Sequence, residues 1–378
     1  MNKFAVMGVA AAICAAFAQP AWSQSASGER EIVKRSRAMV PGGPWPAGDE
    51  RGNGNTIGPG TWLRCAYFLS QPNAKVYEAS HPRSNTMPLS PFSGPYAHKY
   101  NATASIPGSV HAFNGEYLTG GEPAQQGTQY DALGHFGFLP APWDGKGAAP
   151  VDQALYYGGF TQQDVKPNPD SPLMKLGMEK AAPVVTSAVL LDAKTLVGKG
   201  RALQPGQTVT AKDIEAMIRA QGLSWRGILP GDVVYIYTGW GDNWADPDTE
   251  KFYYTKAPGL SFDAANYLAG KRIVAVGLDA PFVDAVNEGQ LQGKAGPAEG
   301  TPPNTPFAVH HTLIAKAGIH HIENARLGEM AKDGVWTSCT MVLPLLEKGG
   351  AGSPIRPVAI GVPRRAAPKN SRSGTANK

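Results

Sequence analysis

Three short apolar runs, rich in β-branched residues and separated by helix signals, constrain the fold of this chain most. The runs cover residues 184–191, 233–237 and 272–278. Runs of this length between turn residues are typical of buried strands. Between them, Thr210 begins a helix that Gly222 ends, and Ser261 begins a shorter helix that Gly270 ends. This alternation predicts a mixed α/β chain with the sheet at its centre.

The 378 residues divide by composition into four segments. The expected segments are an export signal over 1–23, a Gly/Pro-rich surface arm over 24–60, one domain over 61–361, and a basic, disordered tail over 362–378. The body is long enough for one extensive core, and no repeat or linker divides it. The net charge of the chain is +5, but six of its positive charges belong to the tail and to Lys3. Without these six, the rest of the chain has a net charge of −1. We therefore expect no nucleic-acid partner.

The first residues carry the features of an export signal. A lysine precedes an apolar run over 4–17 that is too short to span a bilayer, and Ala21 and Ser23 supply the small residues that a signal peptidase recognises. No later run approaches the roughly 20 apolar residues of a membrane span, so we expect an exported protein, periplasmic or secreted, without a membrane partner. Cys65 and Cys339 remain after cleavage, and the sequence is compatible both with a disulfide between them and with two free thiols.

The segment 125–135 places polar residues where a core strand would carry apolar ones. If the segment is extended, Gln125, Gln129 and Asp131 share one face, and His135 follows at a glycine turn. Amide oxygens, a carboxylate and an imidazole on one patch can bind a metal or act as a general base. From the residues alone, the alternative is an exposed polar strand face without a chemical role. The sequence contains no G-x-S-x-G elbow, P-loop or dinucleotide-binding glycine pattern.

This segment resembles the signature of the cyclase family, the metal-dependent hydrolases that include bacterial kynurenine formamidases and isatin hydrolases. The signature reads H-x-G-T-H-x-D-x-P-x-H, and the matching residues are Gly127, Thr128, Asp131 and His135. Gln125 and Gln129 replace two signature histidines, and Leu133 replaces the proline. Further segments are similar to family motifs in the expected order, at 45–55, 231–240, 276–281, 311–323 and 352–356. The resemblance thus covers residues 45–361.

The resemblance implies a mixed β-sheet curled into a barrel with flanking helices, a homo-oligomer, and metal-dependent hydrolysis of a C–N or C–O bond in a small cyclic or acylated substrate. It implies that Asp131, His311 and Glu323 bind metal. His135 is expected to be the acid/base residue, because an imidazole titrates near neutrality. The residues expected to line the substrate pocket are Trp240, Trp244 and His321.

The two glutamines alter the metal site that the resemblance implies. An amide oxygen binds zinc more weakly than an imidazole, so a site for two metals is not expected. We expect one divalent ion, manganese or zinc, whose coordination is completed by an oxygen of Gln129 or Gln125 or by water. The alternative function is that of a small-molecule binding protein on the same scaffold, with a decayed metal site.

Several other histidines lie near these candidates. A helix is predicted over 307–317, on which His310 and His311 point about 100° apart, so only one can face a common site. On the strand that follows, His321 and Glu323 share a face and His320 lies on the other. His321 is therefore also a candidate ligand or a partner of a ligand, with surface or core packing as the alternative. The histidines at 81, 98 and 111 could each replace a lost ligand, and a structural role fits each of them as well.

Overall fold

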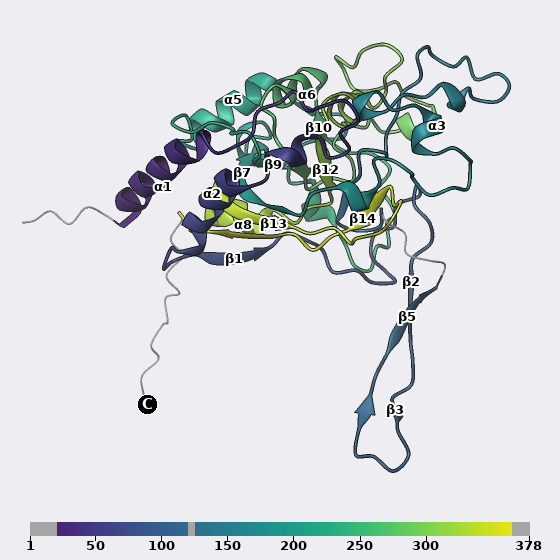
Figure 1. The fold of residues 1–378 in the computed structure, drawn as a ribbon, viewed down its shortest axis with the longest axis horizontal. Helices are drawn as coiled ribbons and strands as arrows, with labels where there is room; N and C mark the ends of the chain where they lie inside the picture. The colour runs from purple at the N-terminus through teal and green to yellow at the C-terminus, as the bar shows by residue number, and fades with distance from the viewer. Residues whose placement is uncertain (1–20, 120–124, 365–378) are drawn as a thin grey trace, which may run out of the picture.

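A computed structural model describes residues 21–119 and 125–364 of the chain, which are built around a nine-stranded mixed sheet (Figure 1). Along the sheet the strands lie in the order β1 (Lys75–Glu78), β15 (Val358–Gly361), β13 (Thr337–Val342), β7 (Val184–Asp192), β9 (Val233–Tyr237), β11 (Ala275–Leu278), β12 (His320–Glu323), β6 (Gln129–Asp131) and β14 (Gly352–Pro354). The sheet curls into a half-barrel with helices at its sides, which confirms the predicted fold class.

The centre of the sheet is parallel. Strands β7, β9, β11 and β12 run parallel to one another, whereas the other neighbouring pairs of this sheet are antiparallel. Every residue of β9 and β11 is buried, as expected for parallel strands that are covered on both faces. The three predicted strands are confirmed, with β11 beginning at Ala275 and not at residue 272.

Two capped helices cover one face of the sheet (Figure 1). These are α5 (Ala211–Ala220) and α6 (Phe262–Ala269). Both begin as predicted, because the Thr210 hydroxyl accepts a hydrogen bond from the backbone of Asp213 and the Ser261 hydroxyl accepts one from Ala264. Their apolar faces form one core with β7, β9 and β11, which includes Ile214, Met217, Leu268, Val189, Val234 and Val276.

The remaining elements are short or lie at the edges. The other α-helices are α1 (Ala21–Arg37), α2 (Pro59–Leu69), α3 (Gln162–Val165), α4 (Ala193–Leu196), α7 (Ala308–His310) and α8 (Gly328–Asp333). Single 3-10 turns are η1 (Gly52–Thr56), η2 (Val151–Gln153), η3 (Tyr157–Gly159), η4 (Met178–Lys180), η5 (Trp240–Asn243) and η6 (Gln290–Gln292). A two-stranded parallel sheet joins β8 (Thr208–Val209) to β10 (Gly259–Leu260).

The helix predicted over 307–317 is divided into two parts. Helix α7 ends at His310, and the π-helix η7 (His311–Lys316) continues the chain. Gly318, with a φ of 63°, then reverses the chain into β12. Single π turns within helices are frequent at functional sites, since the wider turn changes where successive side chains point.

The segment 24–60 differs from the surface arm that its composition predicts. Its first part continues α1, which packs against α2, and α2 in turn packs on the sheet at β7 and β13. Cys65 of α2 and Cys339 of β13 form a disulfide, which decides between the two states that the sequence left open. The parts of the predicted signal and tail at 1–20 and 365–378 lie outside the described residues.

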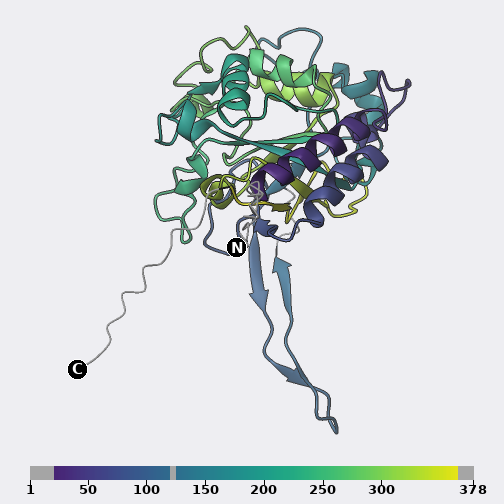
Figure 2. The same cartoon turned by 90° about the vertical axis from the view of Figure 1, so that its left-hand side faces the viewer.

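A long hairpin projects from the body between β1 and β6 (Figures 1 and 2). It consists of the antiparallel pair β2 (Ala97–Tyr100) and β5 (Glu116–Thr119), followed outward by the pair β3 (Ala104–Ser105) and β4 (Ala112–Phe113). We call residues 97–119 the hairpin arm. Among the described helices of the whole chain, none has the length and apolar character needed to cross a bilayer.

Candidate metal centre

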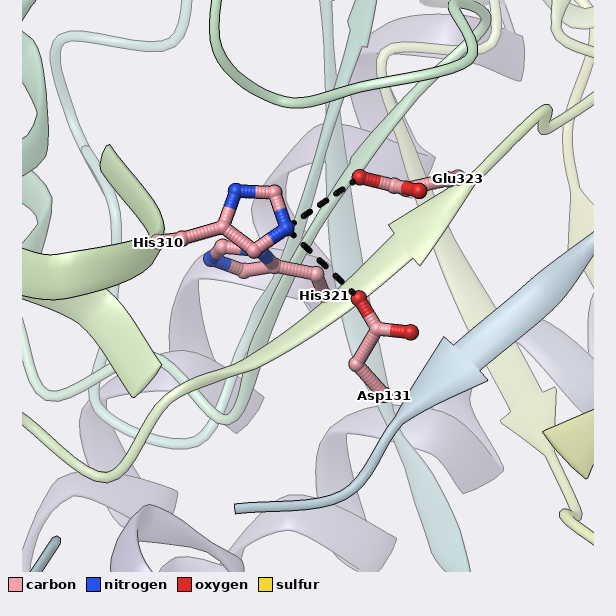
Figure 3. Close-up of side chains that lie close together, drawn as sticks. All are labelled: Asp131, His310, His321 and Glu323. Carbon is pink, nitrogen blue, oxygen red and sulfur yellow. Dashed lines mark ion pairs between the residues drawn. The ribbon is translucent and has the colours of Figure 1, made fainter. Parts of the chain in front are cut away.

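Two antiparallel strands bring the candidate residues together. Glu323 of β12 is in register with Gln129 of β6, so the residues at 321 and 323 and those at 129 and 131 project from the same face. Asp131, His310, His321 and Glu323 each offer one ligand atom, and these four atoms lie within 4.8 Å of one another (Figure 3). All four side chains are buried.

His310 faces the two carboxylates. Its Nε2 atom lies 3.6 Å from Oε1 of Glu323 and 4.0 Å from Oδ2 of Asp131 (Figure 3). The His321 ring packs edge-on against that of His310, with the ring centroids 4.6 Å apart. The cluster therefore offers two imidazoles and two carboxylates around one point.

Asp284 holds His310 in this orientation. Its carboxylate accepts hydrogen bonds from the backbone N–H of Val309 at 2.7 Å and of His310 at 3.1 Å, and lies 2.6 Å from Nδ1 of the His310 ring. With Nδ1 bound to Asp284, Nε2 is left to face the cluster. A carboxylate behind a histidine in this way is the usual arrangement for a metal-ligating imidazole, because it fixes both the tautomer and the ring orientation.

The unsatisfied atoms of the cluster fit a divalent cation. Within the described chain, Oδ2 of Asp131 and both ring nitrogens of His321 are buried without a hydrogen-bond partner. Burial, and after it the negative charge of Asp131, raise the pKa of Glu323 well above its ordinary value, and burial lowers the pKa of His321 well below its own. A cation would pair these acceptors and remove the repulsion between the carboxylates. Two nitrogen and two oxygen donors suit zinc or manganese.

Gln129 lies in the cluster, but the orientation of its amide differs from our expectation. Its Nε2 atom donates to Oε2 of Glu323 at 2.9 Å and lies 3.3 Å from Oδ1 of Asp131. The nitrogen of the amide, and not the oxygen expected as a metal ligand, thus faces the carboxylates. Gln125 precedes β6 and does not share its face; its amide nitrogen lies 3.5 Å from Nδ1 of His135.

His135 lies beside the cluster, with its ring 6.3 Å from that of His310. Burial lowers the pKa of His135 below its ordinary value of 6.5, against the opposing effect of Asp131. The ring is therefore neutral at pH 7 and able to accept a proton. On the other face of β12, Nδ1 of His320 lies 2.8 Å from the backbone oxygen of Asp131, and this contact helps to fix β6.

His311 lies outside the cluster. Its ring is half-buried and packs edge-on against Phe138, in the wall of a cleft of about 530 Å³. Of the two adjacent histidines only His310 belongs to the cluster; His311, the residue that the resemblance implies as a ligand, does not. The cleft lies next to the cluster, because two of its lining residues, Phe136 and Phe307, also pack against His310. Their ring centroids lie 5.2 and 6.1 Å from that of the His310 ring.

The other predicted residues occupy different positions. Trp240 is a core residue with 5% exposure, so its assignment to the substrate pocket is corrected. Trp244 stacks on His81 and lines a cavity that shares no residue with the cluster. His321 was expected in the substrate pocket and lies among the four cluster residues instead. The histidines at 98 and 111 lie on the hairpin arm, and neither belongs to this cluster.

The family model described as "Putative cyclase" matches residues 77–285, more than half of the chain. The chain belongs to the cyclase family. A kynurenine formamidase of Bacillus cereus is 35% identical to this cyclase-family chain over 101 residues, which are 27% of this chain and 39% of the formamidase. The formamidase of Bacillus thuringiensis matches to the same extent. The chain thus spans well under half the length of the curated relatives that it matches.

Solved structures agree with this family assignment at the level of the fold. A crystal structure described as a novel cyclase superposes with a TM-score of 0.66 at 24% identity, covering 83% of this chain and 97% of that one. An isatin hydrolase bound to the product analogue thioisatinate superposes with a TM-score of 0.50 at 19% identity, covering 78% and 95%. At these identities the likeness concerns the fold.

Sequence reasoning missed two residues of this cyclase-family site. His310 was considered only as a neighbour of His311, and Asp284 was not singled out at all. The contact between them joins positions 26 residues apart, across a loop whose course no periodicity indicates. The carboxylate directly after β11 is that of Asp279, which binds the backbone at Thr238 and Gly239, so the position of a carboxylate at a strand end does not point to Asp284.

Proposed function

We propose that this protein is a metal-dependent hydrolase that cleaves the C–N or C–O bond of a small amide, lactam or lactone. The observation that carries the proposal is the buried cluster of Asp131, His310, His321 and Glu323, which lies beside an open cleft and keeps an oxygen of Asp131 and both ring nitrogens of His321 without a partner in the described chain. Buried acceptors without partners are costly to a fold, so a site that keeps them is expected to bind a cation. Membership of the cyclase family supports the same chemistry.

In the proposed reaction, the divalent ion and His135 have different roles. A divalent ion, when bound, polarises a carbonyl group and lowers the pKa of water. His135, neutral because burial lowers its pKa, accepts a proton from the water that attacks the carbonyl carbon. The same ring then returns the proton to the nitrogen or oxygen that leaves when the C–N or C–O bond breaks. The amide of Gln125, 3.5 Å from Nδ1, limits the positions that this ring can take.

The lining and the size of the cleft beside the cluster favour a small aromatic substrate. Its walls include Phe136, Phe138, Trp143 and Phe307, and two of these rings touch His310. Aromatic rings bind flat apolar groups by stacking and edge contacts, and a cleft of about 530 Å³ holds a one- or two-ring compound. We therefore propose N-formyl anilines and ring-fused lactams or lactones as the substrate class.

A panel assay tests this function. The purified protein, loaded with zinc or with manganese, is assayed on N-formyl anilines, lactams and lactones, with Asp131→Ala as the matched inactive control. We expect metal-dependent hydrolysis of at least one class and no hydrolysis by the variant. If the wild-type protein binds these compounds tightly and turns over none, the protein is a binding protein and the proposed activity is wrong.

We also propose that the protein is exported. The Cys65–Cys339 disulfide supports this, because disulfides persist in oxidising compartments and are rare in the cytosol. Intact-mass measurement of protein from the producing cell is expected to show a chain that begins at Gln24. A mature chain that keeps residues 1–23 would contradict the proposal.

The hairpin arm supports the proposal of a homo-oligomer. Residues 101–115 contain no Asp, Glu, Lys or Arg, and Val110 is 97% exposed with Ile106 and Phe113 exposed beside it. A two-stranded ribbon has no core of its own, so apolar side chains at its end are expected to pack on a second copy of the chain. Exposed Leu343 and Leu346 line an apolar groove that such a ribbon could fill.

Light scattering coupled to size exclusion tests the oligomer. Replacing the three apolar arm residues, Ile106, Val110 and Phe113, by serine is expected to convert the oligomer to a monomer and to leave ion content unchanged. A wild-type protein that is monomeric at micromolar concentration would contradict the proposal.

A further inference from the structure

Gln129 occupies the space between the two carboxylates of the metal centre. Its amide nitrogen lies 2.9 Å from Oε2 of Glu323 and 3.3 Å from Oδ1 of Asp131, and the side chain is 5% exposed. The position is fixed by the backbone, because Gln129 is paired with Glu323 across the strands and lies two residues from Asp131 on the same face. This neutral side chain therefore bridges two acidic ones.

The NH2 end of Gln129, and not its oxygen, faces the two carboxyl groups. Carboxyl oxygens that carry no proton accept hydrogen bonds and cannot donate them. The NH2 group carries two hydrogens, one for each carboxylate. In this orientation the nitrogen, and not the oxygen, is the Gln129 atom nearest the outer oxygens of the two acidic groups.

The two oxygens of each carboxylate therefore have different neighbours, and we call them the outer and the inner oxygen. The outer oxygens, Oε2 of Glu323 and Oδ1 of Asp131, face Gln129. The inner oxygens face His310: Oε1 of Glu323 lies 3.6 Å from its Nε2 atom, and Oδ2 of Asp131 lies 4.0 Å from it and has no hydrogen-bond partner in the described chain. The inner pair therefore faces the two histidines, and its Glu323 oxygen also accepts a hydrogen bond from the backbone N–H of Val283 at 3.2 Å.

We propose that Gln129 takes the place of a second cation, so that this protein holds one ion per chain and keeps its two acidic ligands paired when that ion is absent. The inference rests on the proposed function, which requires the first ion. Two buried carboxyl groups repel each other when both are ionised, unless positive charge or hydrogen-bond donors lie between them. Gln129 supplies those donors on the outer side, and the ion supplies the positive charge on the inner side.

The thermal stabilities of metal-free and metal-loaded protein test the role of Gln129. In Gln129→Leu, the side-chain volume is nearly kept and both hydrogen bonds are lost. We expect the Tm of the metal-free variant to fall by several degrees, and that of the zinc-loaded variant to fall less, because the ion still offsets the repulsion. The difference between loaded and metal-free Tm values is therefore expected to be larger than in the wild-type protein.

Gln126→Leu is the matched control. Gln126 is the neighbouring buried glutamine, and its amide binds the backbone of Ser90 and Gly94, away from the metal centre. Loss of the Gln126 amide is expected to lower the Tm of the metal-free protein and that of the zinc-loaded protein by the same amount. An equal fall of both values in Gln129→Leu as well would show that Gln129 has only a packing role, and the inference would be wrong.

Ion stoichiometry provides a test that does not depend on the leucine variant folding. Elemental analysis of wild-type protein dialysed against zinc or manganese is expected to give one ion per chain. Gln129→His places a nitrogen donor on the outer side, and its ion content is expected to rise above one. Two ions in the wild-type protein, or no more than one in Gln129→His, would overturn this inference alone, whereas no ion in the wild-type protein would overturn the proposed function with it.

Discussion

Replacing His310 by alanine is expected to remove the divalent ion from the purified protein, whereas replacing its neighbour His311 is expected to leave the ion in place. His310 directs Nε2 toward both carboxylates, so its loss removes one of two nitrogen donors from a four-residue site. Losing a direct ligand typically costs orders of magnitude in affinity. His311 lies against Phe138 in the cleft wall and contributes no atom to the cluster.

Elemental analysis after dialysis measures this difference, and circular dichroism shows whether each variant keeps the fold. The two substitutions are adjacent, remove the same side chain and fall at the junction of α7 and η7, so a general disturbance of the helix would affect both alike. An ion content in His310→Ala equal to that of the wild-type protein would show that the site lies elsewhere. Loss of the ion in His311→Ala alone would restore the assignment that the family resemblance implies.

The parts of the fold that follow from local patterns could be predicted from the sequence. Strands β7 and β9 are continuous apolar runs, and the caps of α5 and α6 involve residues within three positions of one another. Such features need no knowledge of distant contacts. By contrast, helix α1 lies in a segment whose later Gly and Pro content suggested an irregular arm, and its packing on α2 is a tertiary effect.

The candidate site could be predicted as far as strand periodicity extends. The shared face of His321 and Glu323, and that of Gln129 and Asp131, follow from the alternation of side chains along a strand. The choice between His310 and His311 does not, because it depends on the hydrogen bonds of Asp284 and on the π-helix that begins at 311. The direction of the Gln129 amide likewise depends on Glu323, which lies 194 positions away.

His135 is expected to be needed for turnover and dispensable for metal binding. Its ring lies beside the cluster but is not one of the four residues whose ligand atoms converge. His135→Ala is therefore expected to keep the ion content of the wild-type protein and to lose about 10² to 10⁴ in kcat, the range typical of a general acid or base. The assay uses the panel substrate that the wild-type protein hydrolyses best, and added imidazole is expected to restore part of the rate.

The pH profile of the wild-type protein gives an independent measure of the same residue. A protonated imidazole cannot accept a proton, so the rate falls on the acid side as pH drops through the pKa of His135. Since burial lowers that pKa, the fall is expected below the ordinary value of 6.5, and this acid limb should be absent from the residual activity of His135→Ala. If kcat is unchanged in the variant, or if the acid limb persists, then the proton is transferred by a different group.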